Sequence, residues 1–141
     1  MAASQVVSIR LRSDQVERLR KFARRFGKSQ SQMGAELIEE SMRETEFDKI
    51  EFKDTAIGRQ AFMKGTRLKV WGLIMVGRGY KHDRAAIARH FEKPVEWVDA
   101  AYKYYAAFPD EIDCAIESND VGYERLKQIL PNIHLTEVNT D

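Results

Sequence analysis

The fold of this chain is decided near its N-terminus, by the stretch Val6-Val7-Ser8-Ile9-Arg10-Leu11-Arg12. Apolar side chains alternate in it with side chains that are mainly polar or basic. One face carries Val7, Ile9 and Leu11, and the other carries Val6, Ser8, Arg10 and Arg12. Alternation with a period of two over about seven residues is typical of a β-strand with one buried face. The sequence therefore predicts a short strand that is apolar on one face and basic on the other.

Two short helices are predicted to follow the strand. Ser13-Asp14 can cap the first, with Glu17 placed to complete a capping box, and Gly27 ends it. Ser29 can cap the second, with Gln32 at the box position. Each helix carries apolar residues at helical spacing. These are Val16, Leu19, Phe22, Ala23 and Phe26 in the first helix, and Met33, Leu37, Ile38 and Met42 in the second.

A strand followed by two short helices is too small to fold alone. The strand has two unpaired edges, and roughly 40 residues bury too little apolar surface for a stable core. Pairing with the same strand of a second copy removes both faults, because four helices then cover the apolar face of Val7, Ile9 and Leu11. We therefore expect a homodimer, or a higher oligomer built from it, whose antiparallel ribbon fits the major groove of DNA.

This order of elements resembles the ribbon-helix-helix family of bacterial repressors and antitoxins, the class of Arc, MetJ and CopG. The matching stretch is Val7–Ser41, about a quarter of the chain. Its most specific part is the strand running into Ser13-Asp14, followed by Gly27-Lys28-Ser29-Gln30-Ser31-Gln32-Met33. The resemblance implies a dimeric β-α-α domain over residues 1–46 that binds operator DNA.

The resemblance also implies roles for individual residues. The outward strand residues would read bases, and they are Val6, Ser8, Arg10 and Arg12. Val6 is apolar where the family commonly has a polar residue, so it contacts a thymine methyl group or no base. The start of the second helix would bind a DNA phosphate, through Lys28, Ser29, Gln30 and Ser31. Arginine favours guanine O6 and N7, and free N–H groups at a positive helix end bind anions.

The second half of the chain is predicted to be mainly helical. Residues 47–60 have the pattern of a linker, and residues 61–70 that of a β-hairpin turning at Lys64-Gly65. Helices are expected at residues 71–76, 84–91, 94–108 and 109–119, the first of them ended by Gly77-Arg78-Gly79. A short helix, a tight turn at Glu92-Lys93 and a longer helix are typical of a helix-turn-helix.

The predicted fold class is therefore mainly α. A ribbon-helix-helix domain is followed by a small helix-turn-helix-like domain at residues 61–120, which includes the short β-hairpin. A C-terminal segment, residues 121–141, has a weaker helical signal and is expected to bind a partner or to be mobile before binding. Its apolar anchors are Tyr123, Leu126, Ile129 and Leu130.

Residues 58–120 resemble a small uncharacterised helix-turn-helix family common in bacterial VapB-type antitoxins. The resemblance is carried by Gly65-Thr66-Arg67-Leu68-Lys69-Val70, by Gly77-Arg78-Gly79 and by Ala100-Ala101-Tyr102-Lys103-Tyr104-Tyr105-Ala106-Ala107-Phe108-Pro109-Asp110-Glu111-Ile112. Such domains are encoded beside PIN-like nuclease toxins, so the resemblance implies an antitoxin that represses its own operon. Two alternatives remain open: a stand-alone repressor with a C-terminal oligomerisation or ligand domain, and an adaptor that does not bind DNA.

The charges of the chain are segregated, although the formal net charge is only +1. Residues 1–30 carry eight basic and two acidic side chains, and residues 51–93 carry ten and four. Residues 94–141 carry three and ten. Two basic blocks favour nucleic-acid binding. The acidic block suits a basic toxin, with Tyr123, Leu126, Ile129 and Leu130 as apolar contacts, or it only keeps the protein in solution.

No catalytic or metal-binding set is recognisable, so neither an enzyme nor a cofactor is expected. His82, His90 and His134 are scattered, and no glycine-rich phosphate loop is present. No apolar run approaches the roughly 18 residues of a membrane span, and the N-terminus lacks the pattern of a signal peptide. The single cysteine, Cys114, is expected to be a small core residue. We therefore expect a protein of the reducing cytoplasm.

Overall fold

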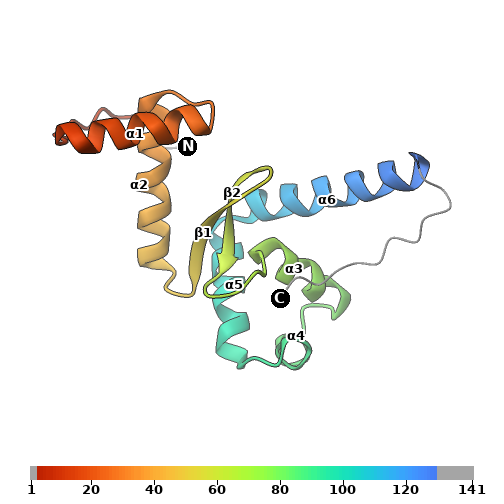
Figure 1. Cartoon of the computed structure of the whole chain (residues 1–141). Coiled ribbons are helices and arrows are strands. Elements are labelled where there is room, and N and C mark those ends of the chain that lie inside the picture. The colour runs from red at the N-terminus through yellow and green to blue at the C-terminus, as the bar shows by residue number, and fades with distance from the viewer. Residues whose placement is uncertain (1–2, 130–141) are drawn as a thin grey trace. The chain divides into compact units, whose positions relative to one another are not determined.

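The computed structural model of the chain describes residues 3–129, except for the side chains of Leu126 and Lys127 (Figure 1). It contains six helices and a two-stranded antiparallel sheet, so the chain is mainly helical, as predicted. Two compact units are present, Met1–Met42 and Arg43–Asp141. They are called unit 1 and unit 2. The division lies four residues before the predicted domain end at residue 46, inside the second helix.

Unit 1 begins its regular structure with helix α1, Ser13–Arg25. The strand predicted at residues 6–12 is not formed in this structure of one chain, in which both described strands follow α2. The helix ends in the left-handed turn expected at Gly27, which has φ +63°. The N–H of Lys28 donates to the carbonyl of Ala23 at 2.9 Å, and the N–H of Gly27 donates to the carbonyl of Arg24 at 3.2 Å. This pair of bonds is a Schellman motif, which satisfies two of the carbonyls that a helix end leaves free.

The start of helix α2, Gln30–Glu46, is also the one predicted. The N–H of Gln32 donates to Ser29 Oγ at 3.1 Å, and the N–H of Ser29 donates to Gln32 Oε1 at 3.1 Å. These reciprocal bonds form a complete capping box. They confirm that Ser29 caps the helix and that Gln32 closes the box.

The start of helix α1 differs from the prediction. The N–H of Arg12 donates to Gln15 Oε1 at 3.0 Å, so Arg12 is the cap and the helix begins two residues earlier than a cap at Asp14 requires. Asp14 accepts a bond at 3.0 Å from the Arg12 guanidinium instead, and Glu17 lies 3.6 Å from Arg20. The predicted box between Asp14 and Glu17 is therefore wrong, because both carboxylates have arginine partners.

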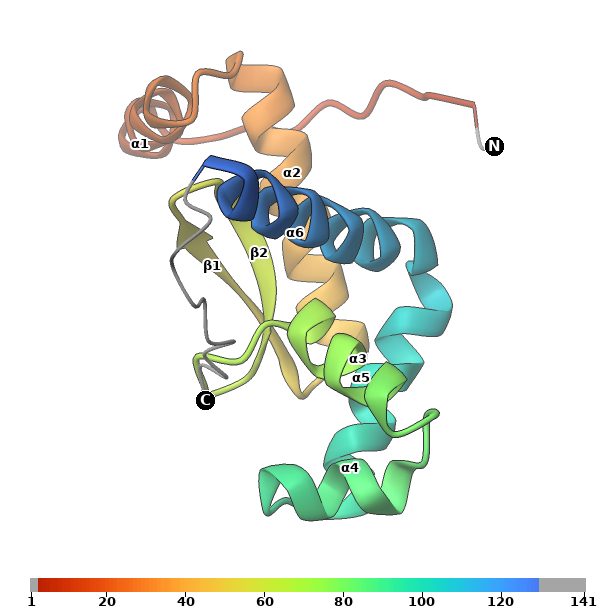
Figure 2. The same ribbon diagram turned by 90° about the vertical axis from the view of Figure 1, so that its right-hand side faces the viewer.

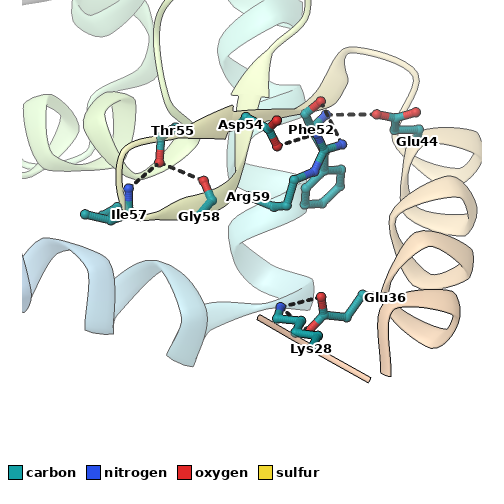
Figure 3. Close-up of polar contacts among 9 residues, drawn as sticks. All are labelled: Lys28, Glu36, Glu44, Phe52, Asp54, Thr55, Ile57, Gly58 and Arg59. Carbon is teal, nitrogen blue, oxygen red and sulfur yellow. Dashed lines mark hydrogen bonds and ion pairs between the residues drawn. The ribbon is translucent and has the colours of Figure 1, made fainter. Parts of the chain in front are cut away.

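Unit 2 opens with a β-hairpin in the region predicted as a linker. Strands β1, Ile50–Thr55, and β2, Gly58–Met63, pair antiparallel from Ile50 opposite Met63 to Thr55 opposite Gly58. Figure 3 shows the turn, in which the Thr55 hydroxyl donates to the Gly58 carbonyl at 2.7 Å. Gly58 has φ +116°, a conformation that other residues rarely adopt.

Two sequence predictions in this region are thus wrong. Residues 47–60 are not a linker, because they include β1 and the core residue Ile50. The hairpin predicted at residues 61–70 lies about ten residues earlier. The turn expected at Lys64-Gly65 exists, with φ +76° at Gly65, but it leads from β2 into an isolated bridge between Phe62 and Lys69.

Four helices complete unit 2, and they are α3 Val70–Gly79, α4 Arg84–Phe91, α5 Val95–Ala107 and α6 Pro109–Ile129. The short helix, tight turn and longer helix of α4 and α5 are present as predicted. Glu92 makes the turn in the left-handed region, with φ 54°. Helix α6 does not stop near residue 120 but continues as one helix to Ile129.

Helix α3 is central to unit 2, since it contacts β2, α4, α5 and α6 (Figure 2). The core between these elements is fully apolar except for the tyrosines of α5. Its fully buried side chains include Ile50, Met63, Val70, Leu73, Ile74, Ile87, Val98, Tyr104 and Ile116. Cys114 is not part of it: the thiol is on the exposed face of α6, so the expectation of a core cysteine is wrong.

Tyr104 connects this core to the last turn of α2. Its buried hydroxyl donates to Glu111 at 2.7 Å and accepts a bond from Arg43 at 2.8 Å. Burial and the Glu111 carboxylate raise the pKa of Tyr104 far above its ordinary value. The Arg43 guanidinium also lies 3.6 Å from the ring centre of Phe108 and donates to Glu111 at 2.8 Å. The last turn of α2, which carries Arg43, is thereby fixed to α5 and α6.

Gly77 has a packing role that the sequence did not reveal. It was predicted to end a helix, but α3 passes through it to Gly79. Gly77 is buried, and a Cβ atom at this position would overlap the hydroxyl of Tyr102 and lie 3.2 Å from Ile87 Cδ1. Tyr102 cannot move away without losing its bond to His82 Nδ1 at 2.7 Å. A side chain larger than hydrogen therefore does not fit.

We predict that Gly77→Ala lowers the free energy of unfolding by about 1–3 kcal/mol, because an added methyl overpacks the core. Gly79→Ala is the matched control: it lies in the same helix with no atom within 4 Å of a Cβ. That variant should unfold like the unmodified protein or slightly later. Urea unfolding followed by circular dichroism compares the two, and equal losses of stability would contradict the packing role.

Candidate nucleic-acid interface

The stretch that precedes α1 is uncovered in the single chain. Residues 3–12 pair with no strand among the residues that the structure describes. The exposed fraction is 96% for Val6, 78% for Val7, 60% for Ile9 and 40% for Leu11. The predicted ribbon core is therefore open to solvent, as is the predicted base-reading face of Val6, Ser8, Arg10 and Arg12.

The two helices of unit 1 leave further apolar surface uncovered. Phe22 of α1 and Ile38 and Met42 of α2 are all exposed. Among the described residues of the unit, only Ala23 and Met33 are fully buried. Burying apolar surface is worth roughly 25 cal/mol per Å², so this arrangement forgoes most of the stabilisation that a core provides. Unit 1 thus leaves exposed much of the apolar surface that a core would bury.

The two arginines of the predicted base-reading face differ in their surroundings. The Arg12 guanidinium bonds Asp14 at 3.0 Å and lowers the pKa of that carboxyl. Arg10 has no ion pair or side-chain hydrogen bond with any residue from 3 to 129. The donors of Arg10 are therefore open to a ligand, whereas those of Arg12 are partly used by Asp14.

The start of α2 has the geometry of an anion site. Ser29, Gln30 and Ser31 are exposed, and the Ser29 hydroxyl is already used in the capping box. The backbone N–H groups of Gln30 and Ser31 belong to the first helical turn, which has no carbonyl partners within the helix. These groups, rather than the Ser29 side chain, are the donors that a phosphate would meet.

Lys28 contributes less charge to this site than the sequence suggested. Its ammonium group pairs with the Glu36 carboxylate, one helical turn and a half into α2 (Figure 3). An ion pair of this kind offsets the positive charge that a phosphate would experience. The predicted phosphate contact of Lys28 thus requires competition with Glu36.

The helix-turn-helix of unit 2 is poorly suited to read DNA. In that motif the N-terminal residues of the second helix contact base edges. Here α5 begins with exposed Glu96, and Asp99 on the next turn binds Arg84 at 2.8 Å. The opposite side of α5 is buried in the core. The start of α5 therefore presents acidic groups where the motif needs donors.

The far end of α6 forms a separate surface. Ile116 is the last buried residue among the described side chains of α6, and the helix continues beyond the rest of unit 2 (Figure 1). Of the predicted toxin-binding residues, Ile129 is 66% exposed and Tyr123 is half-buried. The Leu126 side chain and Leu130 lie outside the described residues. The structure adds Val121, 61% exposed, which the sequence analysis missed although it is an isolated apolar residue among acidic ones.

Two further observations concern only residues 3–129. No group of three or more His, Cys, Asp or Glu side chains there is placed to hold a metal ion. None of the helices within that range is both long enough and apolar enough to cross a membrane.

Comparison with known proteins gives no relative for this chain: no protein-family model, no curated protein and no solved structure matches it. The function has to be inferred from the geometry of the two units.

Proposed function

We propose that this protein is a cytoplasmic antitoxin of a type II toxin-antitoxin system. Unit 1 forms a ribbon-helix-helix homodimer that binds operator DNA and represses the protein's own operon. Helix α6 of unit 2 binds a PIN-like nuclease toxin. The observation that carries the DNA-binding half of the proposal is the uncovered apolar surface of unit 1, which continues directly into two well-capped helices.

A second copy of the chain is the partner that this surface fits. Antiparallel pairing of residues 6–12 with their copies supplies hydrogen-bond partners for backbone groups that are otherwise unpaired. The same pairing places Val7, Ile9 and Leu11 of both chains on one face. The exposed Phe22 and Ile38 then have apolar neighbours to pack against. In this proposal each chain supplies one strand, and the ribbon forms only when two chains pair.

DNA is the ligand that the other ribbon face suits. Ser8 and Arg10 of both chains lie on that face, and a two-stranded ribbon fits the major groove. In the two-fold dimer the start of α2 occurs twice, so that one phosphate on each side can accept bonds from Gln30 and Ser31. The phosphate contacts position the protein and the Arg10 contacts supply specificity.

The toxin-binding half of the proposal rests on charge and exposure. The projecting part of α6 carries exposed Glu117, Asp120 and Glu124 beside the apolar Val121 and Ile129. A nuclease that acts on RNA must present a basic surface to its substrate. An acidic helix with apolar contacts can cover such a surface, because complementary potentials favour the encounter and suppress wrong partners.

The dimer can be tested on the two faces of one strand. Ile9→Asp should make the protein monomeric, because a carboxylate without a partner would be buried in the ribbon core. Ser8→Asp, on the opposite face, should keep the dimer but weaken DNA binding by repulsion of phosphate. Sedimentation velocity at micromolar concentration measures the assembly. A monomeric unmodified protein, or a dimer that Ile9→Asp leaves intact, would sink the proposed ribbon.

Base reading can be tested at Arg10. Arg10→Ala should weaken binding to the operator by about 1–3 kcal/mol and binding to random DNA by less, since a bidentate arginine contact discriminates between bases. Lys103→Ala, an exposed cation of α5, serves as the control for loss of one positive charge. Gel shifts on both DNAs at matched salt give the comparison. Equal losses on operator and random DNA would show that Arg10 only contacts phosphate.

The α6 surface can be tested with the operon intact. The double change Val121→Arg and Ile129→Arg should abolish co-purification of the toxin and restore its toxicity, while operator binding is kept. Ser118→Arg, an exposed position on the same helix, controls for the added charge. Full neutralisation by the double variant would place the toxin site elsewhere. Operator binding without any co-purifying nuclease would favour a stand-alone repressor.

A further inference from the structure

Unit 2 contains a pocket that the proposed function does not use. It has a volume of about 570 Å³ and lies where β1, the turn after β2, the end of α4 and the start of α5 meet. Its wall includes Lys53, Thr66, Arg67, Phe91, Lys93 and Trp97. Small-molecule sites in proteins are typically of about 300–1,000 Å³, so this one can hold a molecule with a ring and a charged group.

The pocket has an excess of positive charge. Lys53 is compensated, since its ammonium group lies 3.0 Å from Glu51 and donates to the Thr66 carbonyl at 2.8 Å. Glu51 is held ionised: the Lys53 ammonium and the Gly65 N–H lower its pKa. Arg67 and Lys93 are exposed and have no carboxylate partner among residues 3–129. Two cations on the wall therefore lack an anion.

The pocket also has an aromatic wall. Trp97 is half-buried, and the edge of its ring system meets Phe91 with centroids 5.7 Å apart. The Lys93 ammonium lies 5.6 Å from the centre of the Trp97 ring. A flat ligand ring that stacks on an aromatic side chain gains about 1–3 kcal/mol, as nucleic-acid bases do on such platforms. The cations and the aromatic surface lie side by side.

We propose that this pocket binds a nucleotide. Its phosphate is held by Arg67 and Lys93, and its base stacks against Trp97. Phosphate suits Arg67 because the planar guanidinium can bond two oxygens at once. The nucleotide is either a free molecule or one unit of a single-stranded nucleic acid, since both present the same base and phosphate. The pocket is independent of the ribbon in unit 1, so it would bind its ligand whether or not Arg10 reads DNA.

The test uses the full-length protein and four probes: inorganic phosphate, a mononucleotide, a short single-stranded oligonucleotide and the operator duplex. Isothermal titration calorimetry gives affinities. The indole N–H resonance of Trp97 reports the site, and Trp71→Phe assigns it because the chain has only two tryptophans. Arg67→Gln and Lys93→Gln remove one cation each, and Lys103→Gln is the control because Lys103 is an exposed lysine of α5 outside the pocket.

We expect the mononucleotide or the oligonucleotide to shift the Trp97 resonance and to bind more tightly than phosphate. Each pocket variant should weaken that affinity about tenfold, the usual loss of one charge-assisted contact, and the control should not. Tighter binding of the oligonucleotide than of the mononucleotide would assign the site to a strand, and the reverse to a free effector. Binding of phosphate as tight as that of both nucleotides, or affinities unchanged in Arg67→Gln and Lys93→Gln, would overturn the proposal.

The proposed ribbon of unit 1 and the proposed nucleotide site of unit 2 can be disproved independently of each other. Arg67→Gln and Lys93→Gln should leave the affinity for the operator duplex within about twofold of that of the unmodified protein, because each charge lies outside unit 1. Arg10→Ala should leave nucleotide binding unchanged. An unmodified protein that binds nucleotide but no operator DNA would contradict the ribbon alone, and one that binds operator DNA but no nucleotide would contradict the pocket alone.

Discussion

An apolar segment needs another surface to cover it, and residues 6–12, which form no strand, have no such surface among the residues that the structure describes. Everything distinctive about unit 1 follows from this constraint. Its helices begin and end in well-formed caps at Gly27 and Ser29, yet between them they bury only Ala23 and Met33 completely among the described residues. The helix ends of unit 1 are well capped, but much of its apolar surface stays exposed. In the proposed dimer, a second copy completes this core, so that dimerisation and folding are coupled.

Unit 2, by contrast, covers its apolar side chains with elements of the same chain. Its hairpin and four helices enclose an apolar core, and Tyr104 joins that core to the last turn of α2 through Arg43 and Glu111. Glu44 on the same turn accepts a bond from the Phe52 N–H at 2.8 Å (Figure 3). Unit 2 thus covers its apolar side chains with residues of its own.

The distribution of charge within unit 2 shows why residue counts alone misjudge a binding surface. Four of the ten cations of its basic block are paired with carboxylates: Lys53 with Glu51 at 3.0 Å, Arg59 with Asp54 at 2.9 Å, Arg78 with Asp113 at 3.0 Å and Arg84 with Asp99 at 2.8 Å. Surface pairs of this kind add little stability, but they remove the positive potential that phosphate would experience. Arg67 and Lys93, which line the pocket beside Trp97, are among the cations without a carboxylate partner in the part of the chain that the structure describes.

The sequence by itself determined the features that depend on residues close together in the chain. The Schellman turn at Gly27, the box of Ser29 and Gln32, and helices α4 and α5 all rest on bonds spanning three to five residues, so their signals are visible in a short window. Only the tertiary structure decided what depends on distant residues. Gly77 is small because Tyr102 lies against it, and residues 50–55 form a strand because residues 58–63 pair with them. The pocket between Arg67 and Trp97 likewise exists because the fold brings the turn after β2 beside the start of α5. A residue's own neighbours in sequence carry no record of such contacts.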